Sequence, residues 1–147
     1  GRVTLHIIKL CVGAEDVDDL RTWQKARLVE KRRNKEKPVL VHVTRMTPTR
    51  AAEVLDGGSL YWVMKGHIRC RQRLIDIEPF VDGEGIKRCK FVLDPEIVLT
   101  RRRERRPFQG WRYFDAKDAP ADAKTASEAD EDMPDEMRAE LEALGLL

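Results

Sequence analysis

The sequence predicts an α+β domain with a mainly antiparallel, barrel-like sheet. Short apolar runs rich in β-branched residues recur along the chain, which is typical of buried strands. A long amphipathic segment follows the first run, and a glycine-rich turn, DGEG, separates two of the later runs. The length of 147 residues suits one domain with its own core.

The strands are expected wherever an apolar run lies between turn residues. "HIRCRQR" and "IKRCKF" flank the DGEG turn, so they are expected to pair as a hairpin. The expected strands are residues 3–11, 39–46, 59–66, 67–80, 86–95 and 96–100.

Two helices are expected in the first part of the chain, over residues 13–34 and 47–58. In the first of these, Val17, Leu20 and Trp23 lie near one helical face, which predicts that they point to the core. Acidic residues gather at its start and basic residues at its end, as the helix dipole favours.

The charge divides the chain into two segments. Residues 1–114 carry 25 Lys and Arg against 15 Asp and Glu, whereas residues 115–147 carry 3 against 11. The net charges are therefore +10 and −8. This predicts a basic domain over 1–114 and an acidic, partly disordered tail over 115–147, with a possible terminal helix at 133–147.

The sequence lacks the signals of membrane, exported, metal-binding and cofactor-binding proteins. There is no apolar run of 18 residues and no export signal at the start, so no membrane partner is expected. The three cysteines form no CxxC pair, which favours a reducing cytoplasm. His67 and Cys70 form an isolated HxxC, so we expect no metal, and no cofactor motif is present.

The hairpin offers one candidate binding surface. Alternate residues of a strand face opposite sides, so Arg69, Arg71 and Arg73 are expected to share one face. Cys70 and Cys89 then fall on the core side. Lys and Arg clustered on one face are typical of proteins that bind nucleic acid.

A second candidate lies in "RRRERRPFQGWRYF", residues 101–114. Arginine binds phosphate through bidentate hydrogen bonds and stacks on nucleobases. Pro107 prevents a long helix in this segment. We expect a flexible phosphate clamp at this point, followed by a closing strand whose Trp111 and Phe114 fill the core. The clamp residues are Arg101, Arg102, Arg103, Arg105 and Arg106.

Catalytic motifs are missing from the sequence. It contains no GxSxG, no phosphate-binding P-loop and no GxGxxG. His6 and His42 lie in apolar strands, where a hydrogen-bonded core histidine is expected.

Four segments resemble a family of short uncharacterised alphaproteobacterial proteins, a domain of unknown function. They are "LHIIKLCVG", "VTRMTPTRAAEVLDGGSLYWVMKGHIRCRQRLIDIEP", "CKFVLDPE" and "RRPFQGWRYF". The resemblance covers roughly residues 3–120, with the acidic tail outside it. It implies no particular chemistry.

"AAEVLDGGSLYWV" is similar to the helix and glycine-led strand of the PUA and ASCH-like superfamily of small β-barrels. That resemblance implies RNA or modified-nucleotide binding on a barrel. Some ASCH-like members are amidohydrolases that use a lysine, a threonine and a glutamate. Arg45 stands where their lysine is expected, and an always-charged arginine is a poor general base.

The leading hypothesis is therefore a cytoplasmic, non-catalytic RNA-binding domain. Beside the clamp, its binding residues are Arg45, Arg50, Lys65, Arg69, Arg71 and Arg73. One alternative is an ASCH-like hydrolase of a modified nucleoside that uses Thr47 with Glu78 or Asp76. Another is a protein-interaction module whose acidic tail meets a basic partner.

Overall fold

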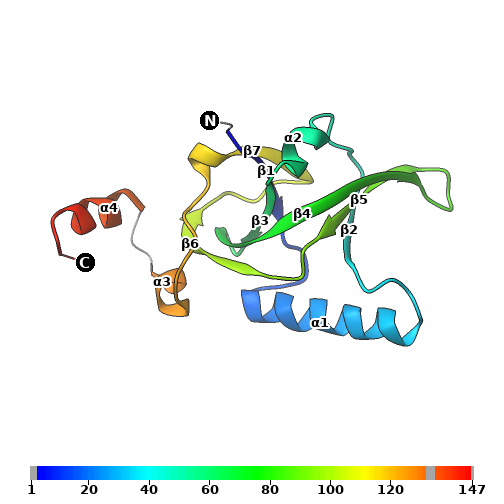
Figure 1. Cartoon of the computed structure of the whole chain (residues 1–147), viewed down its shortest axis with the longest axis horizontal. Helices are drawn as coiled ribbons and strands as arrows, with labels where there is room; N and C mark the ends of the chain where they lie inside the picture. Colours follow the sequence, from blue (N-terminus) through cyan, green and yellow to red (C-terminus); the bar gives the residue numbers. More distant parts are fainter. Residues whose placement is uncertain (1–2, 132–134, 147) are drawn as a thin grey trace.

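A computed structural model describes residues 3–131 and 135–146. It confirms the α+β class and shows the order of elements along the chain (Figure 1). They are β1 (Leu5–Leu10), α1 (Val17–Arg33), β2 (Leu40–Thr44), α2 (Ala51–Leu55), β3 (Ser59–Met64), β4 (His67–Val81), β5 (Lys87–Leu93), β6 (Val98–Glu104), β7 (Trp111–Asp115), a 3-10 turn (Ala116–Asp118), α3 (Ala126–Asp130) and α4 (Asp135–Ala143).

The long strand β4 organises the sheet. The strand order is β2-β5-β4-β3-β1-β7, and β6 also pairs with β4. β1 and β3 are parallel, whereas the other strand pairs are antiparallel. Closing a barrel would require β2 to pair with β7, and in the described chain they end the path on opposite sides. The expected barrel is therefore wrong, and the mainly antiparallel sheet is confirmed.

Apolar side chains are buried on both faces of the sheet. The face toward α1 and α2 carries the larger cluster, which includes Leu20, Val54 and Phe91. The opposite face carries a smaller cluster, covered by Phe108 and by Ala119 from the tail. Its buried members are Ile8, Tyr61, Val63, Ile68 and Phe114.

Helix α1 begins where the Asp16 side chain accepts a hydrogen bond from the Asp19 backbone N–H, at 2.8 Å. Its buried residues are Val17, Leu20 and Gln24. Trp23 is 52% exposed, so the expected apolar face is wrong at this position. The sequence pattern counted apolar residues, whereas the helix turns a glutamine inward because that glutamine finds a partner in the sheet.

That partner is Gln72 of β4, which is fully buried. The two side-chain amides exchange hydrogen bonds of 2.8 Å each. The Gln72 oxygen also accepts a bond from Trp62 Nε1 at 2.9 Å, and its nitrogen donates to the Asp94 carbonyl at 3.0 Å. Every donor and acceptor position of the Gln72 amide is thereby used, as a buried amide requires.

The first part of the tail is attached to the sheet. The Arg101 N–H donates to the Ala121 carbonyl at 2.9 Å, and the Ala123 N–H donates to the Leu99 carbonyl at 2.8 Å. In α3, Ala129 is buried. The expectation of a loosely attached segment is therefore wrong for residues 115–131, because strand β6 offers a free edge that this segment occupies.

The number of helices differs from the expected two. α3 and α4 both lie in the acidic tail, and α4 falls within residues 133–147, where the sequence indicates a possible terminal helix. α2 is shorter than the expected 47–58, and no side chain caps its N-terminus. In the described residues, no helix is long and apolar enough to cross a membrane.

Two expectations about core residues are confirmed. Cys70 and Cys89 are fully buried, and burial raises the pKa of the Cys70 thiol to about 12. Trp111 and Phe114 of β7 are also buried, so the closing strand fills the core.

Replacing Gln72 with leucine should lower the free energy of unfolding by about 3 kcal/mol or more. The change leaves the Trp62 indole N–H, the Gln24 amide and the Asp94 carbonyl without their partner, at about 1–3 kcal/mol for each buried group. Urea denaturation followed by circular dichroism measures this. Thr22→Ala, on the exposed side of α1, is the control and should change stability by less than about 0.5 kcal/mol. Equal stability of Gln72→Leu and wild type would contradict the role of this network.

Candidate nucleic-acid interface

The three arginines of β4 do not form one open basic face. The pairing of β4 with β6 shifts register between Ile68 and Cys70, which places Arg69 at a bulge. Arg69 lies against α1 and α3, and its guanidinium bonds Asp130 at 2.8 Å. Arg71 lies near the start of β3 and makes two bonds to Asp122, of 2.8 and 2.7 Å.

The other residues predicted for this surface are dispersed as well. Arg50 pairs with Glu53 at 2.7 Å on α2, and Lys65 pairs with Glu15 at 3.4 Å. Arg45, in the loop after β2, and Arg73, on β4, are both exposed. The structure therefore places these side chains in several patches, and most of them already have an acidic neighbour.

The arginine-rich segment is part of the folded core rather than a flexible clamp. Arg101, Arg102 and Arg103 belong to β6, and Arg101 is only 7% exposed. Arg103 donates to the carbonyl of Asp118. The sequence pattern ended the expected strand at residue 100, because a run of arginines has no apolar alternation, whereas pairing with β4 extends the strand to Glu104.

The arginines beyond β6 pack on aromatic rings. Arg105 lies 5.3 Å from the centre of the Phe108 ring, and Arg112 lies 4.7 Å from the same ring. Such contacts are attractive because the ring face carries partial negative charge. Arg106 is exposed. Phe108 thus has guanidinium groups close to it, which leaves it a poor platform for an incoming base.

The second half of α1 and the turn after it carry the basic surface that the sequence analysis did not select. Residues 21–37 contain eight Lys and Arg against two Glu. Among the residues that the structure describes, none of these eight takes part in an ion pair. The run "KRRNKEK" is the signal in the sequence for this surface, although the helix dipole alone also accounts for bases at the end of a helix. We call residues 21–37 the α1 basic surface.

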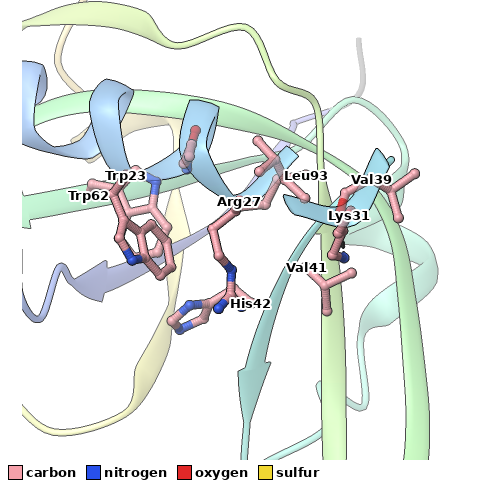
Figure 2. A pocket seen from close by; sticks show the side chains of 10 residues that line it. Trp23, Arg27, Lys31, Val39, Val41, His42, Trp62 and Leu93 are labelled. Atoms are coloured by element: carbon pink, nitrogen blue, oxygen red, sulfur yellow. Dashed lines mark hydrogen bonds between the residues drawn. The ribbon is translucent and has the colours of Figure 1, made fainter. Parts of the chain in front are cut away.

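Trp23 lies on one flank of this helix and is the one exposed aromatic side chain among the residues that the structure describes. The guanidinium of Arg27, one turn later, lies 5.0 Å from the centre of its ring. The close-up in Figure 2 shows both side chains beside β2, with Arg27 extending toward His42. An indole with this exposure offers a flat surface for stacking.

A narrow groove, with a volume of about 20 Å³, lies between this flank of α1 and the edge strand β2. Trp23, Arg27 and Lys31 line its helix side, one turn apart, and Val39 and His42 lie on the other side. The Lys31 ammonium donates to the Val39 carbonyl at 2.7 Å, which ties the two walls together (Figure 2). The groove therefore joins positive charge, an aromatic face and an imidazole along one line.

His42 forms the floor of the groove. Its ring packs edge to face on Trp62, with centres 5.2 Å apart, and its Nε2 is buried without a partner among the described residues. Burial, with a smaller contribution from the charge of Lys9, lowers the pKa of His42 to about 4. The expected core histidine is thus half-buried, and it is neutral at physiological pH.

The residues of the hydrolase alternative lie outside the groove at Trp62. Thr47, Asp76 and Glu78 are exposed, and none of them lines that groove. The Asp76 carboxylate accepts a bond from the Ile77 backbone N–H, at 2.8 Å. Within residues 3–131 and 135–146, no group of three or more His, Cys, Asp or Glu could hold a metal ion.

The imidazole of His42 should titrate near pH 4 in a nuclear magnetic resonance titration, well below its ordinary value of 6.5. Since the unfolded chain takes up this proton first, stability should be constant above about pH 6.5 and fall as the pH drops toward 4. His42→Phe keeps the ring contact and should lose less stability over that interval. A midpoint near 6.5 would contradict the buried neutral ring.

Comparisons with known proteins place the chain in a family. A family model matches residues 7–147. Because the match includes the acidic tail, the expectation that the tail lies outside the resemblance is wrong. No curated protein and no solved structure shows a significant match. The chain therefore belongs to the family described as "Protein of unknown function (DUF1489)".

Proposed function

We propose that this protein binds single-stranded RNA through the α1 basic surface and the groove between α1 and β2. The observation that carries the proposal is the exposed Trp23 beside Arg27. Both lie within a run of Lys and Arg residues that form no ion pair in the described residues. Charge along the strand combined with base stacking is the usual means of holding single-stranded nucleic acid.

The charge supplies affinity that does not depend on sequence. The α1 basic surface has a net charge of +6, while the β4 arginines at positions 69 and 71 are neutralised by the tail. A phosphate chain laid along α1 would therefore meet the least compensated part of the protein. Each neutralised phosphate releases bound cations, so binding should weaken steeply with salt.

The aromatic ring supplies the contact to bases. One side of the Trp23 indole faces Arg27, and 52% of the residue remains exposed. A nucleobase could stack on the open part of the ring. The neighbouring phosphates of the RNA strand would then meet Arg27 and the Lys and Arg side chains of the last helical turn. Because every base has a flat face, such a site has little sequence preference.

The proposal keeps the RNA binding that the resemblance to PUA-like domains implies, but on an open sheet. It also keeps a cytoplasmic location, which is supported by three free cysteines, Cys11, Cys70 and Cys89. An alphaproteobacterial origin stays a prediction. In this proposal, the arginine-rich segment at 101–106 stabilises the fold, and it does not supply the main contacts to RNA.

Fluorescence anisotropy with a labelled 5′-hydroxyl oligouridine tests the charged part of the site. Replacing both Arg27 and Arg33 with glutamine should weaken binding and lower the slope of log affinity against log salt by about 1.4, or about 0.7 for each phosphate contact. The matched control replaces Lys87 and Lys124, two exposed lysines on other elements, with glutamine. Equal losses in the two variants would reject the α1 surface, and no binding at low salt would reject the function.

Trp23→Ala should weaken the same complex roughly five- to a hundredfold, because a stacked base contributes about 1–3 kcal/mol. Trp23→Phe should recover part of the loss, since it retains an aromatic ring. Trp62 and Trp111 are buried, so quenching of tryptophan fluorescence by RNA should vanish in both variants. Unchanged affinity of Trp23→Ala would show that the ring does not contact the bases.

A further inference from the structure

A second cavity lies on the face of the sheet that α1 does not cover. It is formed where β1, β3 and β4 meet, and residues 116–122 rim it. The side chains that give it chemical character are polar: His6, Ser59, Tyr61, Arg71 and Asp122. This cavity is separate from the groove at Trp23, with which it shares no residue.

A close approach of backbones builds the cavity wall. A side chain at Gly58 would meet the carbonyl oxygens of Val54 and Leu5, at 2.2 and 2.3 Å from its Cβ, so only glycine fits. This contact brings the start of β3 against β1. As a result, the Ser59 backbone N–H donates to His6 Nδ1 at 2.9 Å.

Two hydrogen-bond donors open into this cavity without a partner among the described residues. His6 accepts at Nδ1, and burial together with the Arg71 charge lowers its pKa, so its proton lies on Nε2. Tyr61 is buried and packs edge to face on His6, at 4.9 Å, yet its hydroxyl bonds no described group. Both atoms are accessible from the cavity rather than enclosed, so they can donate to a ligand that enters it.

The third donor is the guanidinium of Arg71. Its Nε and Nη2 bond the two oxygens of Asp122 at 2.8 and 2.7 Å, and its Nη1 donates to Ser59 Oγ at 3.0 Å. The Asp122 carboxylate thus occupies the position that an external oxyanion would take on Arg71. The Asp122 side chain is 46% exposed, so it can turn into solvent while its backbone stays bonded to β6.

We propose that this cavity binds a phosphate dianion, which displaces the Asp122 carboxylate from Arg71. A carboxylate has two oxygens, which bond only Nε and Nη2 of the guanidinium. A phosphoryl group has three terminal oxygens and could also accept from His6 Nε2 and the Tyr61 hydroxyl. The three donors come from adjacent strands on one face, which suits a tetrahedral ligand better than a planar one.

Two sources could supply this group, a free phosphate monoester or the terminal phosphate of an RNA strand. Both have a terminal phosphoryl group with three free oxygens, which an internal phosphodiester lacks. The site does not depend on the proposed RNA contact at α1, because none of its residues belongs to the α1 basic surface.

The test is calorimetric titration of the full chain with inorganic phosphate, at constant ionic strength in a cationic buffer. Asp122→Asn removes the internal competitor and should bind phosphate about two- to fivefold more tightly, as expected for a part-exposed ion pair. Arg71→Gln should abolish binding, and Tyr61→Phe should weaken it. Lys87→Gln, at an exposed position on β5, is the control and should bind phosphate as wild type does.

Failure to bind phosphate in both wild type and Asp122→Asn would overturn the proposal, as would wild-type affinity in Tyr61→Phe. Thermal melts establish that each variant is folded, and Tyr61→Phe decides the question if Arg71→Gln does not fold. Comparing 5′-phosphorylated with 5′-hydroxyl oligouridine separates the two sources. A preference for the phosphorylated strand that Arg71→Gln removes identifies the terminal phosphate, and equal affinity assigns the site to a free monoester.

Discussion

The buried amide of Gln72 fixes how the helix layer sits on the sheet. Its four hydrogen bonds join α1, β3, β4 and the loop after β5 in one network. An unsatisfied amide in this position would be costly, so the network permits only one rotation of α1 about its axis. Successive helical residues differ by about 100°, so turning Gln24 inward leaves Trp23 on the flank beside β2.

The distribution of charge follows from a second constraint, the ion pairs between arginines of β4 and aspartates of the tail. The bulge at Arg69 sends that side chain toward α3, while Arg71 remains on the other face. Asp130 then forms an ion pair with Arg69, and Asp122 forms one with Arg71. Because Asp122 and Asp130 pair with arginines of β4, the α1 basic surface keeps its net positive charge.

Much of the fold could be predicted from local patterns, because alternation and glycine turns act over a few residues. The hairpin of β4 and β5, the buried Cys70 and Cys89, and helix α1 all follow from such patterns. What could not be predicted depends on partners far away in the sequence. Gln24 is buried only because Gln72 lies 48 residues later, and Arg71 is paired only because Asp122 folds back over β4.

The candidate site shows the same limit. Counting charges selected the five arginines of the segment at 101–106, where charge density along the chain is highest. Three of them nevertheless lie in β6, where Arg103 donates to the Asp118 carbonyl, and Arg105 lies over the Phe108 ring. Exposure and the absence of acidic neighbours in the described fold, rather than density along the chain, distinguish the α1 basic surface as the place where a polyanion would bind.

The central claim is that RNA meets α1 and the edge of β2 rather than the arginine-rich strand. The most direct measurement is a titration of the isotope-labelled protein with 5′-hydroxyl oligouridine, followed through backbone amide chemical shifts. The account predicts that the largest shifts fall on residues 21–37 and on β2, including the indole N–H of Trp23. Shifts confined to residues 101–106 and the arginines of β4, with α1 unchanged, would contradict it.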